Sequence, residues 1–349
     1  MIRPPARSRR PRPPLPLLSL VIPMHNESAN LDALFARLDA ALGRAGMAAE
    51  IVCVDDGSLD DTLARLKART AQDPRLRVVA LSRNFGKEIA VAAGLRFARG
   101  DAVVLMDADL QHPPEMIETF LAHWREGYRM VYAQRTDRRT ETKRRRWAAG
   151  AFYRLFARIG EVSLPEGAGD FRLLDRAVVD VFNSLGERTR FNKGLYAWLG
   201  FKQIGVPYDV TERNAGTSGW NFLKLYRLAI DGIVAFTTVP LRIWSFLGVI
   251  VSLGAIGYGI YFLIKTLILG IDVPGYPSLI VAIMLFAGIQ LISLGIIGEY
   301  VALMVAEVKR RPLYVISETH GFPAAQETVA GKAPAGGPDD QGPRGRRIA

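Results

Sequence analysis

Two long apolar segments near the carboxyl end constrain the possible folds of this chain most strongly. Ile243 to Ile264 contains no charged residue in 22 positions, and Ser278 to Gly298 contains none in 21. As a helix, each segment is long enough to span a hydrocarbon core of about 30 Å. We therefore predict two transmembrane helices, at about 243–264 and 278–298, within a membrane domain at 241–308.

The charges around these segments predict the orientation of the chain in the membrane. The connecting stretch from Lys265 to Pro277 contains one lysine, whereas Lys309, Arg310 and Arg311 follow the second segment. Positive residues favour the cytoplasmic side, and two spans return the chain to the side on which it entered. We expect a multi-pass membrane protein with its preceding domain and both termini in the cytoplasm.

The region before the membrane domain alternates between strands and helices. Apolar runs rich in β-branched residues predict strands at 17–22, 50–54, 76–81 and 102–106, and a helical pattern follows each strand. This alternation predicts an α/β domain with a Rossmann-like, mostly parallel sheet at 17–220. The remaining parts are a disordered basic arm at 1–16, an interfacial helix at 221–240 and a mostly disordered tail at 309–349.

The fourth predicted strand leads directly into the sequence Asp107-Ala108-Asp109-Leu110-Gln111. If the backbone stays extended there, Asp107, Asp109 and Gln111 alternate onto one side and their oxygen atoms converge. Hard oxygen ligands suit Mg²⁺ or Mn²⁺, whose open positions are commonly filled by phosphate oxygens. The stretch predicts a metal-diphosphate site, although two aspartates at this spacing also occur by chance and need support from their surroundings.

Polar loops after the other strands give that support. The carboxyl ends of parallel strands meet at one edge of a sheet, where open α/β sheets bind ligands. The residues expected at this edge are Glu27, Asp55, Asp56, Arg83 and Asp107. Asp56 and Gly57 also fit an ordinary turn, and the stretch 166–172 reads as a glycine-rich loop that contains Asp170 and Arg172. No G-x-G-x-x-G follows a strand and no P-loop motif occurs, which argues against dinucleotide and P-loop sites.

The net charge of +11 is consistent with nucleic acid, an anionic membrane or a phosphorylated substrate as partner. The apolar segments favour the last two, and we expect no nucleic-acid partner. Seven lysines and arginines lie between Gln134 and Arg146, and an amphipathic pattern from Phe152 to Ile159 follows. This pattern fits a helix on an anionic membrane surface, or alternatively a core-packed helix with a solvated charged entry.

These features together predict an enzyme that takes a soluble, nucleotide-activated donor and passes part of it to an acceptor in lipid. A membrane phosphate as acceptor is already an anion at pH 7, so the reaction needs no strong general base. Catalysis then depends on positioning and on stabilisation of the charge of the leaving diphosphate. A non-enzymatic membrane scaffold or a small transporter is the alternative class, but neither needs acidic loops at the strand ends.

Seven motifs carry a resemblance to a known family. They are IPMHNE, VDDGSLDDT, LSRNFGKEIAVAAGL, MDADLQHPPE, AGDFRLLDR, RFNKGLYAWLGFKQ and IGEYVALMVAEVKRRPLYVI. Together they resemble the glycosyltransferase family 2 enzymes that transfer sugars to polyprenyl phosphate, which are relatives of dolichyl-phosphate mannose synthase. Within these enzymes the chain most resembles the bacterial branch with two carboxyl-terminal spans, and the resemblance covers about residues 17 to 318.

The resemblance implies a GT-A fold, an inverting transfer from a UDP- or GDP-sugar, dependence on Mg²⁺ or Mn²⁺, and a place in the bacterial inner membrane. The residues that it implies for nucleotide-sugar binding are Pro23, Glu27, Asp55 or Asp56, Asp107 and Arg213. The residues that it implies for the metal and the diphosphate are Asp107, Asp109 and Gln111.

Other residues are implied near the acceptor and the reacting centre. Candidates for contact with the lipid phosphate are Arg135, Arg139 and Arg172, and the expected catalytic set is Asp109, Asp170 and Arg172. We expect Asp170 to orient the acceptor or the donor sugar. After Arg213 the chain departs from many relatives, because Gly216 to Trp220 contains neither the glutamate nor the lysine that is common there.

The choice of sugar stays open. UDP-glucose with undecaprenyl phosphate is our first expectation, and GlcNAc, mannose, or an amino- or formamido-arabinose are the alternatives. A processive polysaccharide synthase is disfavoured because the Q-x-x-R-W motif is missing and two spans cannot easily enclose a polymer. Gly248, Gly254 and Gly257 allow close helix approach, from which we expect a homo-oligomer.

Overall fold

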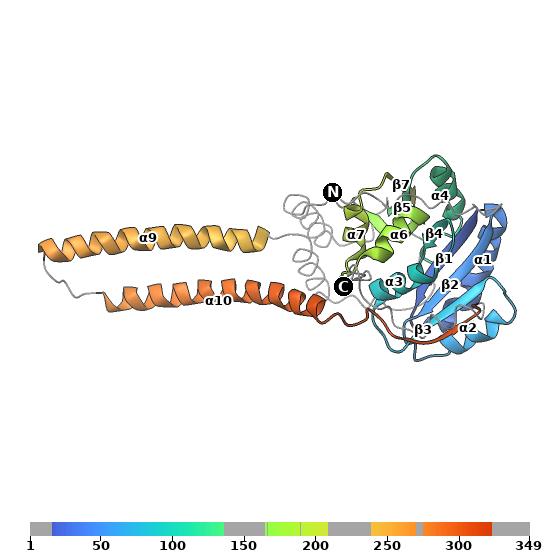
Figure 1. Cartoon of the computed structure of the whole chain (residues 1–349), viewed down its shortest axis with the longest axis horizontal. Helices are drawn as coiled ribbons and strands as arrows, with labels where there is room; N and C mark the ends of the chain where they lie inside the picture. The colour runs from blue at the N-terminus through green and yellow to red at the C-terminus, as the bar shows by residue number, and fades with distance from the viewer. Residues whose placement is uncertain are drawn as a thin grey trace, which may run out of the picture. The chain divides into compact units, whose positions relative to one another are not determined.

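The computed structural model of this protein describes residues 16–135, 165, 167–188, 190–208, 239–269 and 275–322. The chain divides into two compact units. One unit comprises Met1–Tyr153, Leu164–Gly219 and Arg310–Ala349 and contains the β-sheet, and the other comprises Arg154–Ser163 and Trp220–Lys309 and contains two long helices (Figure 1).

The sheet of the first unit has eight strands in the part of the chain that the structure describes, in the order β7-β5-β6-β4-β1-β2-β3-β8. The strands are β1 (Leu17–Met24), β2 (Ala48–Asp55), β3 (Leu76–Leu81), β4 (Ala102–Leu105), β5 (Met130–Arg135), β6 (Ala168–Asp175), β7 (Gln203–Tyr208) and β8 (Ile316–His320). Strands β4, β1, β2 and β3 are mutually parallel, and so are β5 and β7, whereas β6 and β8 run antiparallel to their neighbours. The predicted α/β class with a mostly parallel sheet is therefore confirmed.

Helices pack on both faces of the sheet. The helices are η1 (Ser28–Asn30), α1 (Leu31–Ala45), α2 (Thr62–Thr70), α3 (Lys87–Phe97), α4 (Met116–Arg125), α6 (Arg176–Ser184) and α7 (Asn192–Trp198). Leu20 of β1 shares a core with Leu34 of α1 and Phe120 of α4. The next residue, Val21, points to the opposite face, where a Cβ added at Gly94 of α3 would collide with it. Successive strand residues point to opposite faces, so a buried strand such as β1 is apolar throughout.

Strands β6 and β8 lie where the sequence predicted a loop and a mostly disordered tail. The glycine-rich stretch predicted as a loop leads into β6, whose Phe171, Leu173 and Leu174 are fully buried between β4 and β5. The tail predicted from residue 309 contains β8, which covers the outer edge of β3, and Ser317 Oγ donates a hydrogen bond to Ala80 O at 3.0 Å. A strand edge left open invites pairing with other chains, and β8 fills this one.

The second unit contains α9 (Val239–Leu269) and α10 (Tyr276–Val308), and both predicted spans lie within these helices. Among the described residues, one helix is long and apolar enough to cross a membrane, at Ala282–Val308 in α10. Large apolar side chains such as Phe246 and Leu291 are exposed along both helices. A span in α9 stays a prediction, because its apolar stretch at Gly248–Tyr258 is shorter.

Candidate active site

The site lies at the carboxyl-terminal edge of β3, β2, β1 and β4, where four loops meet. Because these strands are parallel neighbours, their following loops all emerge on one side of the sheet. His25 Nδ1 lies 2.9 Å from the carbonyl oxygen of Asp56, and Asn84 Nδ2 lies 3.1 Å from His25 Nε2, so three of the loops are in contact. The residues placed at this edge, as predicted, are Glu27, Asp55, Asp56, Arg83 and Asp107.

Asp56 holds two of these loops together. Its Oδ1 accepts a hydrogen bond from Phe85 N at 2.7 Å and its Oδ2 accepts one from Gly86 N at 2.9 Å, and the side chain is buried. Gly57 follows with φ of +65°, and a Cβ there would lie 2.5 Å from the backbone carbon of Arg83. Only glycine allows this backbone contact without strain. Both carboxylate oxygens of Asp56 therefore serve the loop structure.

Asp55 and Glu27 have different surroundings. Asp55 Oδ2 accepts a hydrogen bond from Ser58 N at 3.2 Å, whereas its buried Oδ1 has no hydrogen-bond partner. Glu27 Oε2 accepts a hydrogen bond from Asn30 Nδ2 at 2.6 Å. Of the two neighbouring aspartates, Asp55 is thus the one that retains an oxygen atom for a ligand.

The backbone turns directly after Asp107, so the predicted alternation of Asp107, Asp109 and Gln111 along an extended strand is wrong. Strand β4 ends at Leu105, a turn begins at residue 108, and Leu110 has φ of +61°. Asp109 Oδ1 accepts a hydrogen bond from Gln111 N at 3.2 Å. An aspartate that bonds to the backbone two residues later stabilises a turn in place of a strand.

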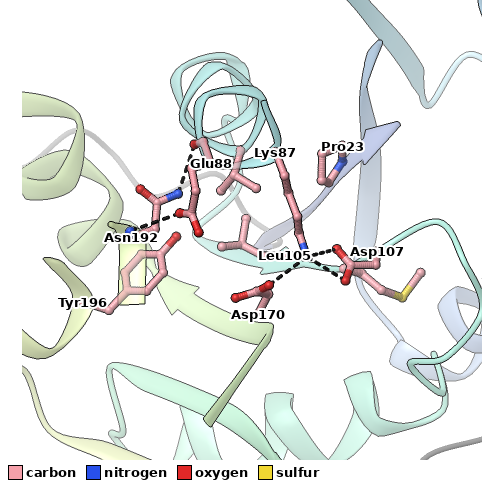
Figure 2. A pocket seen from close by; sticks show the side chains of 10 residues that line it. Pro23, Lys87, Glu88, Leu105, Asp107, Asp170, Asn192 and Tyr196 are labelled. Atoms are coloured by element: carbon pink, nitrogen blue, oxygen red, sulfur yellow. Dashed lines mark hydrogen bonds and ion pairs between the residues drawn. The ribbon is translucent and has the colours of Figure 1, made fainter. Parts of the chain in front are cut away.

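Lys87 was not singled out from the sequence, yet it lies at the centre of the site (Figure 2). Its Nζ lies 2.7 Å from Asp107 Oδ1 and 2.8 Å from Asp107 Oδ2, and it also lies 2.7 Å from Asp170 Oδ2. Lys87 is the first residue of α3, Asp107 follows β4 and Asp170 belongs to β6. Three elements therefore meet at one ammonium group.

Asp170 is held in its ionised form. Burial opposes the charge of its carboxylate, but Lys193 and Lys87 outweigh this effect and hold the pKa of Asp170 well below its usual range. Lys193 Nζ lies 3.4 Å from Asp170 Oδ1. Burial likewise opposes the charge of Lys87, and Asp170 and Asp107 together raise the pKa of Lys87 well above its usual range. Both partners of this ion pair are charged at neutral pH.

A pocket next to Lys87 has a polar wall that the sequence did not reveal. It is lined by Pro23, Lys87, Glu88, Val91, Leu105, Met106, Asp107, Asp170, Asn192 and Tyr196 (Figure 2). Asn192 N donates a hydrogen bond to Glu88 Oε2 at 3.0 Å, while Asn192 Oδ1 and the Tyr196 hydroxyl are buried without hydrogen-bond partners. Burial, followed by the charge of Asp170, raises the pKa of Glu88 to about 7.

Arg172, which was predicted to contact the lipid phosphate, is a buried residue of β6 in the described structure. It is buried, its Nη2 donates a hydrogen bond to Gly169 O at 2.6 Å, and its guanidinium lies 4.2 Å from the centre of the Tyr196 ring. Burial lowers the pKa of Arg172. Arg172 belongs to β6 and pairs with Leu105 of the neighbouring strand β4. It therefore does not lie in the loop that the sequence predicted.

Of the other arginines predicted at the site, the structure describes the position of Arg135. Arg135 is the last residue of β5, in register with Tyr208 of β7. The residues outside the described ranges include Arg139, Arg213, the basic stretch 136–146 and residues 221–238 of the interfacial helix predicted at 221–240.

The described residues fit a divalent metal ion in part. Asp107 and Asp109 supply hard oxygen atoms of the kind that Mg²⁺ and Mn²⁺ prefer. Within the described ranges, however, no group of three or more His, Cys, Asp or Glu residues is placed to hold an ion. Such a donor set suits an ion that takes most of its ligands from phosphate and water. Both oxygens of Asp107 are in contact with Lys87, so an ion bound at Asp107 would share its carboxylate with this ammonium.

Comparison with known proteins identifies the class. Residues 19–182 match the family described as Glycosyl transferase family 2. An uncharacterized glycosyltransferase of Synechocystis sp. is 49% identical over 305 residues, which cover 87% of this chain and 96% of the relative. The chain therefore belongs to glycosyltransferase family 2, as its motifs indicated, and it is a glycosyltransferase.

A further relative has a more specific name. The SfII prophage-derived bactoprenol glucosyl transferase of Shigella flexneri is 41% identical over 303 residues, which cover 87% of this chain and 98% of the relative. Among solved structures, mannosyl-3-phosphoglycerate synthase from Rubrobacter xylanophilus is similar with a TM-score of 0.44 and 20% identity, over 62% of this chain and 71% of that protein.

Proposed function

We propose that this enzyme transfers glucose from UDP-glucose to the phosphate of a polyprenyl phosphate such as undecaprenyl phosphate. The observation that carries this proposal is the 41% identity to a bactoprenol glucosyl transferase over 98% of that protein's length. The match is long enough to include both the sheet and the apolar helices. Similarity over nearly the whole relative favours an acceptor of the same lipid class.

The chemistry requires little proton transfer. A phosphate oxygen of the acceptor attacks C1 of the sugar with inversion, and the bond between C1 and the UDP oxygen breaks. The acceptor phosphate is already an anion, so no residue has to remove a proton from it. Asp170, whose pKa is lowered, is a weak base and suits the positioning of a sugar or of the acceptor better than general base catalysis.

The donor would lie along the loop edge of the sheet. Pro23, Glu27 and Asp55 would hold the nucleoside, and Asp107, Asp109 and Gln111 would face the diphosphate and the metal ion. Mg²⁺ or Mn²⁺, when bound, neutralises charge on the leaving diphosphate. Arg213 is proposed to contact the donor phosphates.

The acceptor would arrive from the membrane. Arg135 and Arg139 are proposed to bind its phosphate, and the basic stretch around them to contact anionic lipid. Spans in α9 and α10 would place the enzyme in the bacterial inner membrane, with the catalytic unit and both termini in the cytoplasm. Gly248, Gly254 and Gly257 would allow the spans of a homo-oligomer to approach closely.

A transfer assay tests the proposal. The purified protein in detergent is incubated with undecaprenyl phosphate and a panel of radiolabelled donors carrying glucose, GlcNAc, mannose or an amino- or formamido-arabinose. We expect labelled lipid from UDP-glucose, and we expect EDTA to abolish it. Labelled lipid from another donor would replace glucose in the proposal, and no labelled lipid from any donor with a folded protein would reject it.

A further inference from the structure

We propose that Lys87 is a diphosphate-binding residue that competes with the divalent ion for Asp107 before the donor binds. In the structure its ammonium contacts Asp107 and Asp170, and when the ion arrives with the donor, the ammonium moves to the diphosphate. This inference rests on the proposed function, because it takes the donor to be a nucleoside diphosphate sugar.

The contacts of Lys87 leave no oxygen of Asp107 unused. An ammonium group has three N–H donors, and three carboxylate oxygens lie within 2.8 Å of Lys87 Nζ. Two of these oxygens belong to Asp107 and one belongs to Asp170 (Figure 2). A metal ion that binds Asp107 needs one of the oxygens that Lys87 contacts.

Charge makes it unfavourable for the ion and the ammonium to share Asp107. A divalent cation and an ammonium at the same carboxylate repel each other because both are positive and lie close together. The donor diphosphate brings negative charge that an ammonium can pair with. When Lys87 moves from the carboxylate to the diphosphate, its ammonium therefore keeps an anionic partner. The ion then binds Asp107.

The local structure lets the ammonium move while its backbone stays in place. The two residues before Lys87 are fixed, because Phe85 N and Gly86 N both donate hydrogen bonds to the buried Asp56. The lysine side chain is flexible, and that of Lys87 is 43% exposed. Asp170 does not lose its only cation in the exchange, because Lys193 Nζ lies 3.4 Å from its other oxygen.

The test measures binding of Mn²⁺ alone by the full-length protein in detergent, through the electron paramagnetic resonance signal of the free ion. The variants are Lys87→Met and the matched control Lys193→Met. Each removes one positive charge near Asp170, but only Lys87 contacts Asp107. We expect Lys87→Met to bind Mn²⁺ about tenfold more tightly than wild type, and Lys193→Met to change the affinity by less than about threefold.

A second measurement follows the diphosphate. With saturating Mn²⁺, we expect Lys87→Met to bind UDP about tenfold more weakly than wild type, because it lacks the cation that pairs with phosphate. Lys87→Gln retains hydrogen-bond donors for the two carboxylates and replaces Lys87→Met if that variant does not fold.

Equal Mn²⁺ affinity in wild type and the Lys87 variants would overturn the competition, and so would an equal gain in Lys193→Met. Unchanged UDP affinity would overturn the transfer of Lys87 to the diphosphate. A wild-type protein that binds neither UDP nor GDP would reject the proposed function together with that transfer, whereas the Mn²⁺ measurement without nucleotide still decides whether Lys87 competes for Asp107.

Discussion

The guanidinium of Arg172 lies 4.2 Å from the centre of the Tyr196 ring, and both side chains are buried beside the pocket that Lys87 lines. A desolvated cation over an aromatic ring contributes about 2 kcal/mol, and a hydrogen bond from a charged donor contributes about 1.5–3 kcal/mol. Arg172 makes both contacts, the second to Gly169 O. This pair therefore connects β6 to α7 from the inside of the unit.

Replacing Arg172 is expected to affect stability more than acceptor binding. We expect Arg172→Ala to lower the free energy of unfolding by about 2–4 kcal/mol, because it removes both contacts and leaves a cavity. Thermal unfolding followed by tryptophan fluorescence measures this loss. A variant with unchanged stability and a raised KM for polyprenyl phosphate would restore Arg172 as a residue that binds the lipid phosphate.

Tyr196→Phe is expected to leave the protein equally stable or to raise its melting temperature. The Tyr196 hydroxyl is buried without a hydrogen-bond partner, and an unsatisfied buried polar group costs about 1–3 kcal/mol. Phenylalanine keeps the ring beneath Arg172 and removes only the oxygen. Differential scanning fluorimetry of the two proteins side by side checks this, and a clear drop in melting temperature would mean that the hydroxyl has a partner in solution.

The central strands could be predicted from the sequence because their signal is local. Leu76–Leu81 was predicted with the same bounds as β3, since an apolar run with β-branched residues lies between polar loops. Strand β8 could not be predicted, because its sequence ISETH is short and polar, and it is a strand only through pairing with β3, more than two hundred residues earlier.

The candidate site likewise contains some residues that could be predicted from the sequence and others that could not. The acidic residues Glu27, Asp55 and Asp107 could be found because each lies close to the end of a strand, β1, β2 or β4. Lys87 could not, because its importance depends on Asp107 and Asp170, which lie 20 and 83 positions later and approach only through the sheet topology. Arg172 was misplaced because glycines at 167 and 169 suggested a loop where β6 forms.

We expect the two neighbouring aspartates at the end of β2 to have different roles: Asp56 stabilises the fold and Asp55 binds the donor. We expect Asp56→Asn to lower the free energy of unfolding by about 1–3 kcal/mol, since it weakens the charge-assisted hydrogen bonds from Phe85 N and Gly86 N. Asp55→Asn should instead reduce affinity for UDP with little loss of stability. Chemical unfolding and nucleotide titration of both variants decide this, and the reverse assignment would make Asp56 the nucleoside ligand.

Asp109→Asn is expected to reduce turnover by about 10²- to 10³-fold while the protein stays folded, because an amide is a weaker ligand for a hard cation than a carboxylate. Asparagine keeps the oxygen that accepts the hydrogen bond from Gln111 N, so the turn after β4 should persist. Initial rates at saturating donor and circular dichroism give the two readouts. A fully active variant would remove Asp109 from the proposed metal site.

We expect Glu88 to make the protein less stable as the pH rises from acidic to neutral. Its pKa is about 7 in the folded protein and 4.5 in an exposed glutamate, so between these values the folded state binds more protons than the unfolded state. The contribution of Glu88 to stability is therefore fully present below pH 4.5 and is lost as the pH rises to about 7. Each pKa unit corresponds to about 1.4 kcal/mol, and partial exposure of the side chain lowers the total, so we expect a loss of about 1–3 kcal/mol.

The measurement is the melting temperature of wild type and Glu88→Gln across this pH range. The glutamine oxygen can still accept the hydrogen bond from Asn192 N, so the variant removes the titration and keeps the contact. We expect the stability of wild type relative to Glu88→Gln to fall as the pH rises from 4.5 to 7. Parallel curves for the two proteins would show that Glu88 titrates alike in the folded and unfolded states, and that water reaches its carboxylate beside Asp170.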